Sequence, residues 1–354
     1  MKRVFFSLAV VALLTSGCNK DVDDLKSVVT VGLYVLSEGD WNVGNGQLVY
    51  FDYNSDTDRF VRNNDKRFQN FGEMPNDMVI YGSKMYAAIT GSGSDVGDGM
   101  VRVINPSNGE IITDIVITKD AAEQMPRRLA ATGGKVYVTL YSGALAQIDT
   151  AMFTYDVISL NGTFSDGICI YGQSLFICNS GQGAGNTVSI VNISTFTQTE
   201  TITVPYNPVN IVNAGNGELY LNTATVWDNW EVAAPPNVHV LNATSKTVTQ
   251  TLNVAVENLA VGKDYVYGVG FDWSSFGTTL KKINIADKTV SEFTETPQDY
   301  SMGYKLSVNP LTNDVFLTDM GQNVYRFEED GTYVETLQIG QNNGAAVVFI
   351  DANK

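Results

Sequence analysis

The most regular pattern of hydrophobic and polar positions in the chain runs from Pro126 to Asp149. Small, β-branched and aromatic residues lie on both sides of Gly133-Gly134, and glycine accepts the positive φ angles of a tight hairpin turn. The pattern predicts two short strands, and a second turn at Tyr141-Ser-Gly leads to a third strand that ends at Ile148-Asp149. Because one such unit cannot bury its own apolar faces, we expect it to pack against similar units.

The same unit recurs along the whole chain. Each copy carries an aromatic residue in its second strand, and each third strand ends with an apolar residue followed by Asp, Asn or Glu. A fourth segment rich in Thr, Val and Ile follows, as in residues 111–117 and 247–252. The aromatic residues recur about every 40–50 residues, which is the length of one blade of a β-propeller. They are Tyr34, Tyr86, Tyr137, Phe176, Tyr220, Tyr267 and Phe316. Seven units of four strands predict an all-β fold, a seven-bladed β-propeller.

The first unit begins at its second strand and has no innermost strand of its own. The C-terminal segment 345–350 resembles the innermost strands around Met78, Leu129, Ile168 and Leu306. If it pairs with the first unit, it covers exposed strand edges and closes the ring. We therefore predict that the C-terminal strand completes blade one.

The N-terminal segment has the features of a secretory signal. Lys2-Arg3 precedes an apolar run that is too short to span a bilayer. The segment Leu14-Thr-Ser-Gly-Cys18 resembles the bacterial lipobox, which implies a lipoprotein signal peptide over residues 1–17 and lipidation of Cys18. Residues 18–27 are then expected to form an acidic tether, and residues 28–354 the propeller. The acidic run after Cys18 resembles the surface-export signal of Bacteroidetes lipoproteins, which implies an outer-membrane location facing the cell exterior.

The charge balance excludes several classes of partner. The chain has 38 Asp and Glu against 22 Lys and Arg, and its formal net charge is −16. Phosphate contacts to nucleic acid need clustered cations, so nucleic-acid binding is not expected. The sequence also has no Lys/Arg cluster for a membrane surface, so any membrane contact should run through the Cys18 lipid alone.

The residues needed for common catalytic sites are scarce. His239 is the only histidine in the sequence, and its alternation places it as a structural residue on a third strand. Without a second histidine, neither a Ser-His-Asp triad nor a His-based zinc site can form. Cys169 and Cys178 lie in one hairpin, and either a disulfide or buried free thiols fit the sequence. We expect no catalytic residues and no bound metal, and hence a protein that is not an enzyme.

Aromatic residues concentrate where the repeat varies most in length. The loops between strands two and three differ most between units, and in a propeller they share one face with the connections between blades. All four tryptophans lie in these loops, beside Asn, Gln and Arg. Such a surface usually has a partner that covers it, so this face is the predicted ligand-binding site. The candidate residues are Trp41, Asn42, Arg67, Phe68, Arg127, Arg128, Tyr141, Phe164, Tyr206, Trp227, Trp230, Phe271, Trp273, Phe276, Tyr300 and Asn342.

Two segments resemble a known family. The stretch from Tyr34 to Asn42, followed by Gly46 to Asp52, resembles the opening blade of YncE-like propeller lipoproteins of Bacteroidetes. Residues 165–172 and 175–181 resemble the recurring blade signature of that family. The best-understood members are BtuG-type surface lipoproteins, which capture cobalamin and pass it to a TonB-dependent outer-membrane transporter (BtuB-like). The resemblance implies cobalamin or a related corrinoid as a transported ligand, with no cofactor, and Arg67, Arg127 or Arg128 could meet its phosphate.

Two other functions remain open from the sequence. A surface glycan-binding lipoprotein would also use exposed tryptophan rings. A calcium-dependent lactonase-like propeller enzyme would need carboxylates that converge near the axis of the ring.

Overall fold

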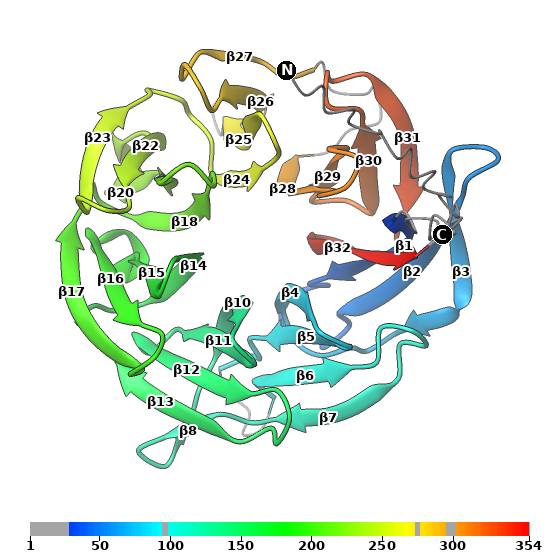
Figure 1. Ribbon diagram of the computed structural model, residues 1–354, viewed down its shortest axis with the longest axis horizontal. Helices are drawn as coiled ribbons and strands as arrows, with labels where there is room; N and C mark the ends of the chain where they lie inside the picture. Colours follow the sequence, from blue (N-terminus) through cyan, green and yellow to red (C-terminus); the bar gives the residue numbers. More distant parts are fainter. Residues whose placement is uncertain (1–27, 94–97, 273–276, 295–301, 354) are drawn as a thin grey trace, which may run out of the picture.

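The computed structural model describes residues 28–93, 98–272, 277–294 and 302–353. Seven four-stranded antiparallel sheets surround a central axis, which confirms the predicted all-β seven-bladed propeller (Figure 1). Each sheet is one blade, and its strands follow one another from the axis outward. Short hairpin turns favour this order because they join neighbouring antiparallel strands.

The strands have the following bounds, given from the innermost strand outward. Blade 1 contains β32 (Gly344–Asn353), β1 (Val28–Ser37), β2 (Gln47–Asn54) and β3 (Arg59–Phe68). Blade 2 contains β4 (Pro75–Tyr81), β5 (Lys84–Ile89), β6 (Met100–Ile104) and β7 (Ile111–Ile115). Blade 3 contains β10 (Pro126–Thr132), β11 (Lys135–Leu140), β12 (Ala144–Asp149) and β13 (Tyr155–Ser159). Blade 4 contains β14 (Ser165–Tyr171), β15 (Ser174–Asn179), β16 (Thr187–Asn192) and β17 (Thr197–Thr203).

The remaining three blades follow the same order. Blade 5 contains β18 (Pro208–Asn213), β19 (Glu218–Thr223), β22 (Asn237–Asn242) and β23 (Thr247–Thr251). Blade 6 contains β24 (Asn258–Val261), β25 (Tyr265–Asp272), β26 (Gly277–Asn284) and β27 (Val290–Glu292). Blade 7 contains β28 (Gly303–Val308), β29 (Val315–Asp319), β30 (Asn323–Phe327) and β31 (Tyr333–Gln338). Two small hairpins, β8 (Thr118–Lys119) with β9 (Ala122–Glu123) and β20 (Val226–Asp228) with β21 (Glu231–Ala234), and the 3-10 turn η1 (Gly181–Gly183) lie in connections.

The hydrophobic core lies between neighbouring blades. The repeated second-strand aromatics are all buried, with 0–1% of their surface exposed. Tyr86 of blade 2, for example, belongs to a cluster with Val136 and Val138 of blade 3. Because each sheet buries its faces against its two neighbours, the apolar residues are used between blades.

The C-terminal strand closes the ring as predicted. β32 pairs antiparallel with β1, from Ser37 opposite Gly344 to Val28 opposite Asn353. In Figure 1 the red β32 lies beside the blue β1, on the axis side of blade 1. Val28 and Asn353 therefore lie at the same end of blade 1, and the loop after Ser37 lies at the other end.

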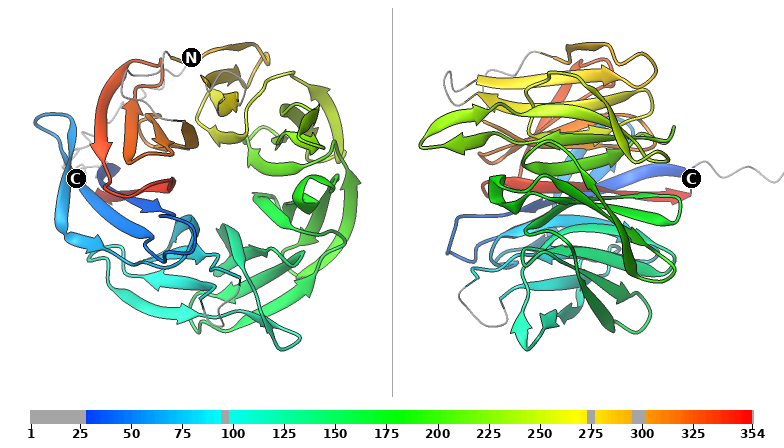
Figure 2. Two further views of the ribbon diagram at one scale, coloured as in Figure 1. Left: turned by 180° about the vertical axis from the view of Figure 1, so that it is seen from behind. Right: turned by 90° about the vertical axis from the view of Figure 1, so that its left-hand side faces the viewer.

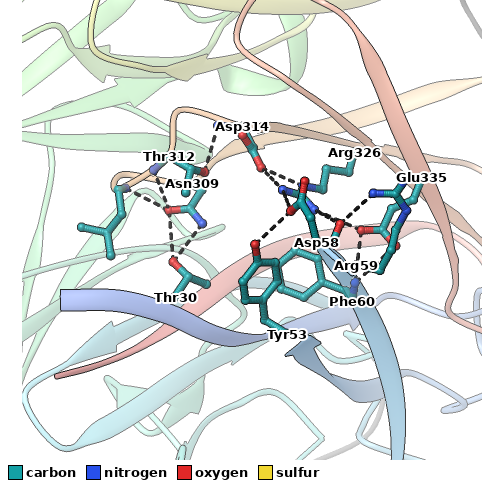
Figure 3. Close-up of polar contacts among 11 residues, drawn as sticks. Thr30, Tyr53, Asp58, Arg59, Phe60, Asn309, Thr312, Asp314, Arg326 and Glu335 are labelled. Carbon is teal, nitrogen blue, oxygen red and sulfur yellow. Dashed lines mark hydrogen bonds and ion pairs between the residues drawn. The ribbon is translucent and has the colours of Figure 1, made fainter. Parts of the chain in front are cut away.

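Blades 7 and 1 are also joined by a buried arginine (Figure 3). Arg326 on β30 forms ion pairs with Asp314 at 2.7 Å and Glu335 at 3.3 Å within blade 7. It reaches Asp58 of blade 1 at 2.9 Å, and Glu335 accepts the backbone N–H of Phe60. Burial disfavours the charge on Arg326, but the adjacent Asp58 and Asp314 hold its pKa above the usual range. This network ties the last blade to the first.

Candidate ligand-binding site on the loop face

Two kinds of connection meet on one face of the ring, and we call this face the loop face. They are the loops between the second and third strands of each blade and the connections between blades. Glu38 N donates to Asn343 O at 2.9 Å, and Gly46 N donates to Gly72 O at 3.1 Å. These bonds join the loop between β1 and β2 to the inter-blade connections on either side of it. In the side view of Figure 2, the C-terminus lies on the opposite side of the ring.

The innermost strands bend where they enter from the loop face. In six of the seven, the register with the second strand shifts within the first residues, which is the mark of a β-bulge. Asn76, Val209 and Tyr304 are the extra residues in blades 2, 5 and 7. A bulge redirects side chains, and the side chains of Asn76, Val209 and Tyr304 line the cavities described below.

Arg127 lies at the centre of the resulting polar network. Its Nε is 3.1 Å from Asp166 Oδ1, and its Nη1 donates to Asn76 Oδ1 at 2.6 Å. Its guanidinium carbon lies 5.0 Å from the centre of the Tyr141 ring. Burial disfavours the charge on Arg127, but Asp166 keeps its pKa above the usual range. The residue is thus a fixed cation that connects three blades.

Tyr304 and Lys305 reach the same region from β28. The Tyr304 hydroxyl donates to the Glu38 carboxylate, with 2.8 Å to each oxygen. Burial, reinforced by the charge on Glu38, raises the pKa of Tyr304, so the phenol remains a donor. Burial, reinforced by the guanidinium groups of Arg128 and Arg127, lowers the pKa of Lys305 to about 7.

Three adjoining cavities open on the loop face around this network. The central cavity has a volume of about 540 Å³, and the axial pocket below it has about 240 Å³. Both are lined by Arg127 and Tyr304, so they meet at these side chains. A side groove of about 620 Å³ adjoins the central cavity at Gln182. Together they give room for a ligand much larger than a single sugar or amino acid.

Eight of the predicted site residues line these cavities. Trp41, Arg127, Tyr141 and Phe164 line the central cavity. Arg127, Arg128 and Phe271 line the axial pocket, and Tyr206 and Trp227 line the side groove. Trp41, Tyr206 and Trp227 expose 61%, 57% and 50% of their surface, so their rings are open to a ligand.

Other predicted residues lie elsewhere on the molecule. The backbone N–H of Asn42 donates to Glu73, and Asn342 Nδ2 donates to Asp40 at 2.9 Å; both order the loop after β1. Phe68 packs between blades 1 and 2 in a cluster with Tyr34. Trp230, 96% exposed, lies in the turn of the β20–β21 hairpin and lines none of the three cavities.

Some of the predicted residues cannot be placed in the fold. Cys18, Trp273, Phe276 and Tyr300 lie outside the described residues, as does the Arg67 side chain.

His239 has the structural role that its alternation indicates. It is buried in blade 5, where its Nδ1 lies 2.9 Å from Thr251 Oγ1 and its Nε2 lies 3.3 Å from Thr223 Oγ1. Burial lowers its pKa. Cys169 and Cys178 are both buried and free. Within the described residues, no group of three or more His, Cys, Asp or Glu is placed to hold a metal ion, and no helix is long and apolar enough to cross a membrane.

Sequence reasoning missed several residues that line the axial pocket. They occupy the two positions before the first core residue of each innermost strand. These two positions could have been found from the repeat itself, because they directly precede the first core residue of the strand. In four blades that core residue is Met78, Leu129, Ile168 or Leu306. The missed residues are Asn210, Glu257, Asn258 and Lys305 in the axial pocket and Asn76 in the central cavity.

Comparison with known proteins supports the fold. Neither protein-family models nor curated proteins match this sequence. Among solved structures, hydrazine synthase of Kuenenia stuttgartiensis is similar with a TM-score of 0.63 and 15% identity, over 78% of this chain and 95% of that one. The Neurospora crassa Pan2 WD40 domain is similar with a TM-score of 0.54 and 7% identity, over 72% of this chain and 75% of that domain. At these identities the likeness establishes the β-propeller fold alone.

Proposed function

We propose that this protein is a non-catalytic, lipid-anchored binding protein that captures cobalamin or a related corrinoid on the loop face. The observation that carries the proposal is the central cavity, which continues into both the axial pocket and the side groove. A ligand that fills such a space must be large, and it must present both apolar and hydrogen-bonding surface. A corrinoid has both, because its ring has apolar faces and its rim carries amide arms.

The lining of the cavities matches this chemistry. Trp41, Tyr141 and Phe164 offer apolar ring surface in the central cavity. Gln182 joins this cavity to the side groove, and its amide can donate to and accept from the amide arms of the ligand. Apolar walls with a few placed polar groups are typical of small-molecule sites.

The cellular setting is part of the proposal. It rests on the likeness of the segment before Cys18 to a lipobox and of the opening blade to YncE-like lipoproteins. In this setting Cys18 carries the lipid in the outer membrane, and the bound corrinoid passes to a TonB-dependent transporter.

One observation favours a second candidate, a surface glycan-binding protein. The hairpin β20–β21 carries Trp230 and Trp227, which are 96% and 50% exposed. Exposed tryptophan rings stack on sugar faces, and a projecting hairpin can reach a polysaccharide chain. In this case binding would depend on Trp230 and would not require the cavities.

Calorimetric titration with cyanocobalamin tests the proposal. We expect micromolar or tighter binding, and we expect Trp41→Ala to weaken it about tenfold because an exposed ring that covers the ligand is lost. Trp230→Ala is the matched control, since Trp230 lines none of the cavities, and it should leave corrinoid binding unchanged. No heat at micromolar cyanocobalamin would reject the corrinoid, and polysaccharide binding lost in Trp230→Ala would establish the second candidate.

A further inference from the structure

The axial pocket is lined by one cationic side chain that forms no ion pair with a described residue. Arg127 and Arg128 both line this pocket, and both lie within ion-pair distance of Asp166, at 3.1 and 3.7 Å. Lys305 lines the same pocket, but its Nζ makes no hydrogen bond or ion pair with any described residue. Its Nζ lies over the Tyr304 ring, 4.9 Å from the ring centre, in a cation–π contact. The side chain is partly buried, and Glu38 and Asp166 favour its charge without forming an ion pair with it.

The acidic side chains near Lys305 are already engaged. Asp166 lies between the two arginines, and Asp77 accepts the backbone N–H groups of Met78 at 2.9 Å and Leu129 at 2.8 Å. Glu38 accepts from the Tyr304 hydroxyl.

Glu257 is the remaining carboxyl group at the pocket. It accepts from Thr225 Oγ1 at 3.1 Å, and burial raises its pKa, so it gives up its proton less readily. None of these carboxyl groups forms an ion pair with the Lys305 ammonium group, which therefore still has donors for a ligand anion.

We propose that the axial pocket binds an anionic group, of the phosphate or sulfate class, between Lys305 and Arg128. The inference rests on the proposed function in one respect, because the anion belongs to the ligand held in the central cavity above. For a cobamide this group is the phosphate of the nucleotide loop. Arg128 Nη1 already donates to Asn76 O at 2.5 Å, so its Nη2 is the donor offered to the anion, and the Lys305 ammonium group supplies a second, compact charge.

The proposal predicts a coupling between binding and protonation. Without the anion, the pKa of Lys305 is lowered to about 7, so much of the amine is neutral above that pH. A bound anion favours the ammonium form, and binding above pH 7 must therefore take up a proton. Affinity for an anion that does not itself titrate should fall as the pH rises from 7 to 9.

Sulfate is the probe, because its charge is constant over this range. We expect sulfate to bind the full chain in calorimetry at pH 7, at least tenfold more weakly at pH 9, and at least tenfold more weakly at pH 7 in Lys305→Met. Lys119→Met is the control, because Lys119 pairs with the adjacent Asp120 in the β8–β9 hairpin and lines none of the three loop-face cavities. Equal sulfate affinity in the wild type and in Lys305→Met would mean an adventitious ion only and would overturn the proposal, as would no binding at all.

A corrinoid pair then separates the anion site from the proposed function. Cyanocobalamin carries the nucleotide-loop phosphate, and dicyanocobinamide does not. If Lys305→Met weakens cyanocobalamin tenfold and leaves dicyanocobinamide unchanged, the phosphate occupies the axial pocket. If sulfate binds through Lys305 but neither corrinoid binds, the anion site stands and the corrinoid function fails.

Discussion

Lys305 is a residue whose environment works against its ordinary charge. In the unfolded chain a lysine has a pKa of about 10.4, and in the fold burial and the two neighbouring arginines lower the pKa to about 7. Between these values the unfolded chain holds a proton that the folded chain does not, so this residue makes folding more favourable as the pH rises from 7 to 10. Below pH 7 its destabilising effect is fully present.

Replacing Lys305 with Met should therefore stabilise the protein. Since one pKa unit corresponds to about 1.4 kcal/mol, we expect a gain on the order of 1 kcal/mol or more at pH 6.5, and a smaller gain at pH 9.5. Chemical denaturation of wild type and variant at both pH values measures this. A gain that is absent at pH 6.5, or equal at both pH values, would contradict the assigned environment of the amine.

The sequence predicts some site residues well and others poorly, for a physical reason. Arg127, Tyr141 and Phe164 follow from their place beside variable loops, and they line the central cavity. Lys305 does not, because alternation sends adjacent residues to opposite faces of a strand. The β-bulge at Tyr304 breaks this alternation, and both Tyr304 and Lys305 line the axial pocket. A period-two pattern cannot reveal such a break.

At the scale of elements, strands and hairpins divide the tasks of stability and recognition. The fold follows from the repeat because every blade buries the same aromatic position between its neighbours. The hairpin β20–β21 is different, since its residues are mostly exposed and it interrupts blade 5 between β19 and β22. Loops of this kind carry function on a rigid scaffold.

Shortening this hairpin should separate the two tasks. Replacing residues 227–233 with Asn-Gly keeps the pair Val226–Ala234 and supplies a turn suited to a two-residue hairpin. Exposed residues contribute little to stability, so we expect the melting temperature to change by only about 1–2 °C. Ligand affinity should fall, because Trp227 is lost from the side groove. A variant that binds cyanocobalamin as tightly as the wild type would exclude the side groove from the site.

At the scale of the whole molecule, stability depends on closure. The inner edge of β1 has no partner other than β32, and Ala345, Ala346 and Val347 are buried at that junction. An unpaired edge invites pairing with other chains, and the buried area would be exposed to water.

Removing residues 345–354 should therefore destabilise the protein by several kcal/mol, far more than the loss of the hairpin. Thermal unfolding of the truncated chain, with the shortened-hairpin variant as the control, tests this expectation. A truncated chain that melts within about a degree of the wild type would show that the ring is stable without the pairing of β32 with β1.

The antiparallel pairing of β1 with β32 also decides how the molecule can be held. The backbone enters at Val28 and leaves at Asn353 on the same side, away from the cavities. A chain fixed to a sensor chip through either end would expose the loop-face cavities to the flowing solution. Both attachments should therefore give the same ligand affinity. On a cell, a lipid at Cys18 would orient the loop-face cavities away from the membrane in the same way. Transfer of the ligand to a transporter in that membrane would then require the propeller to rotate about the segment that links it to Cys18.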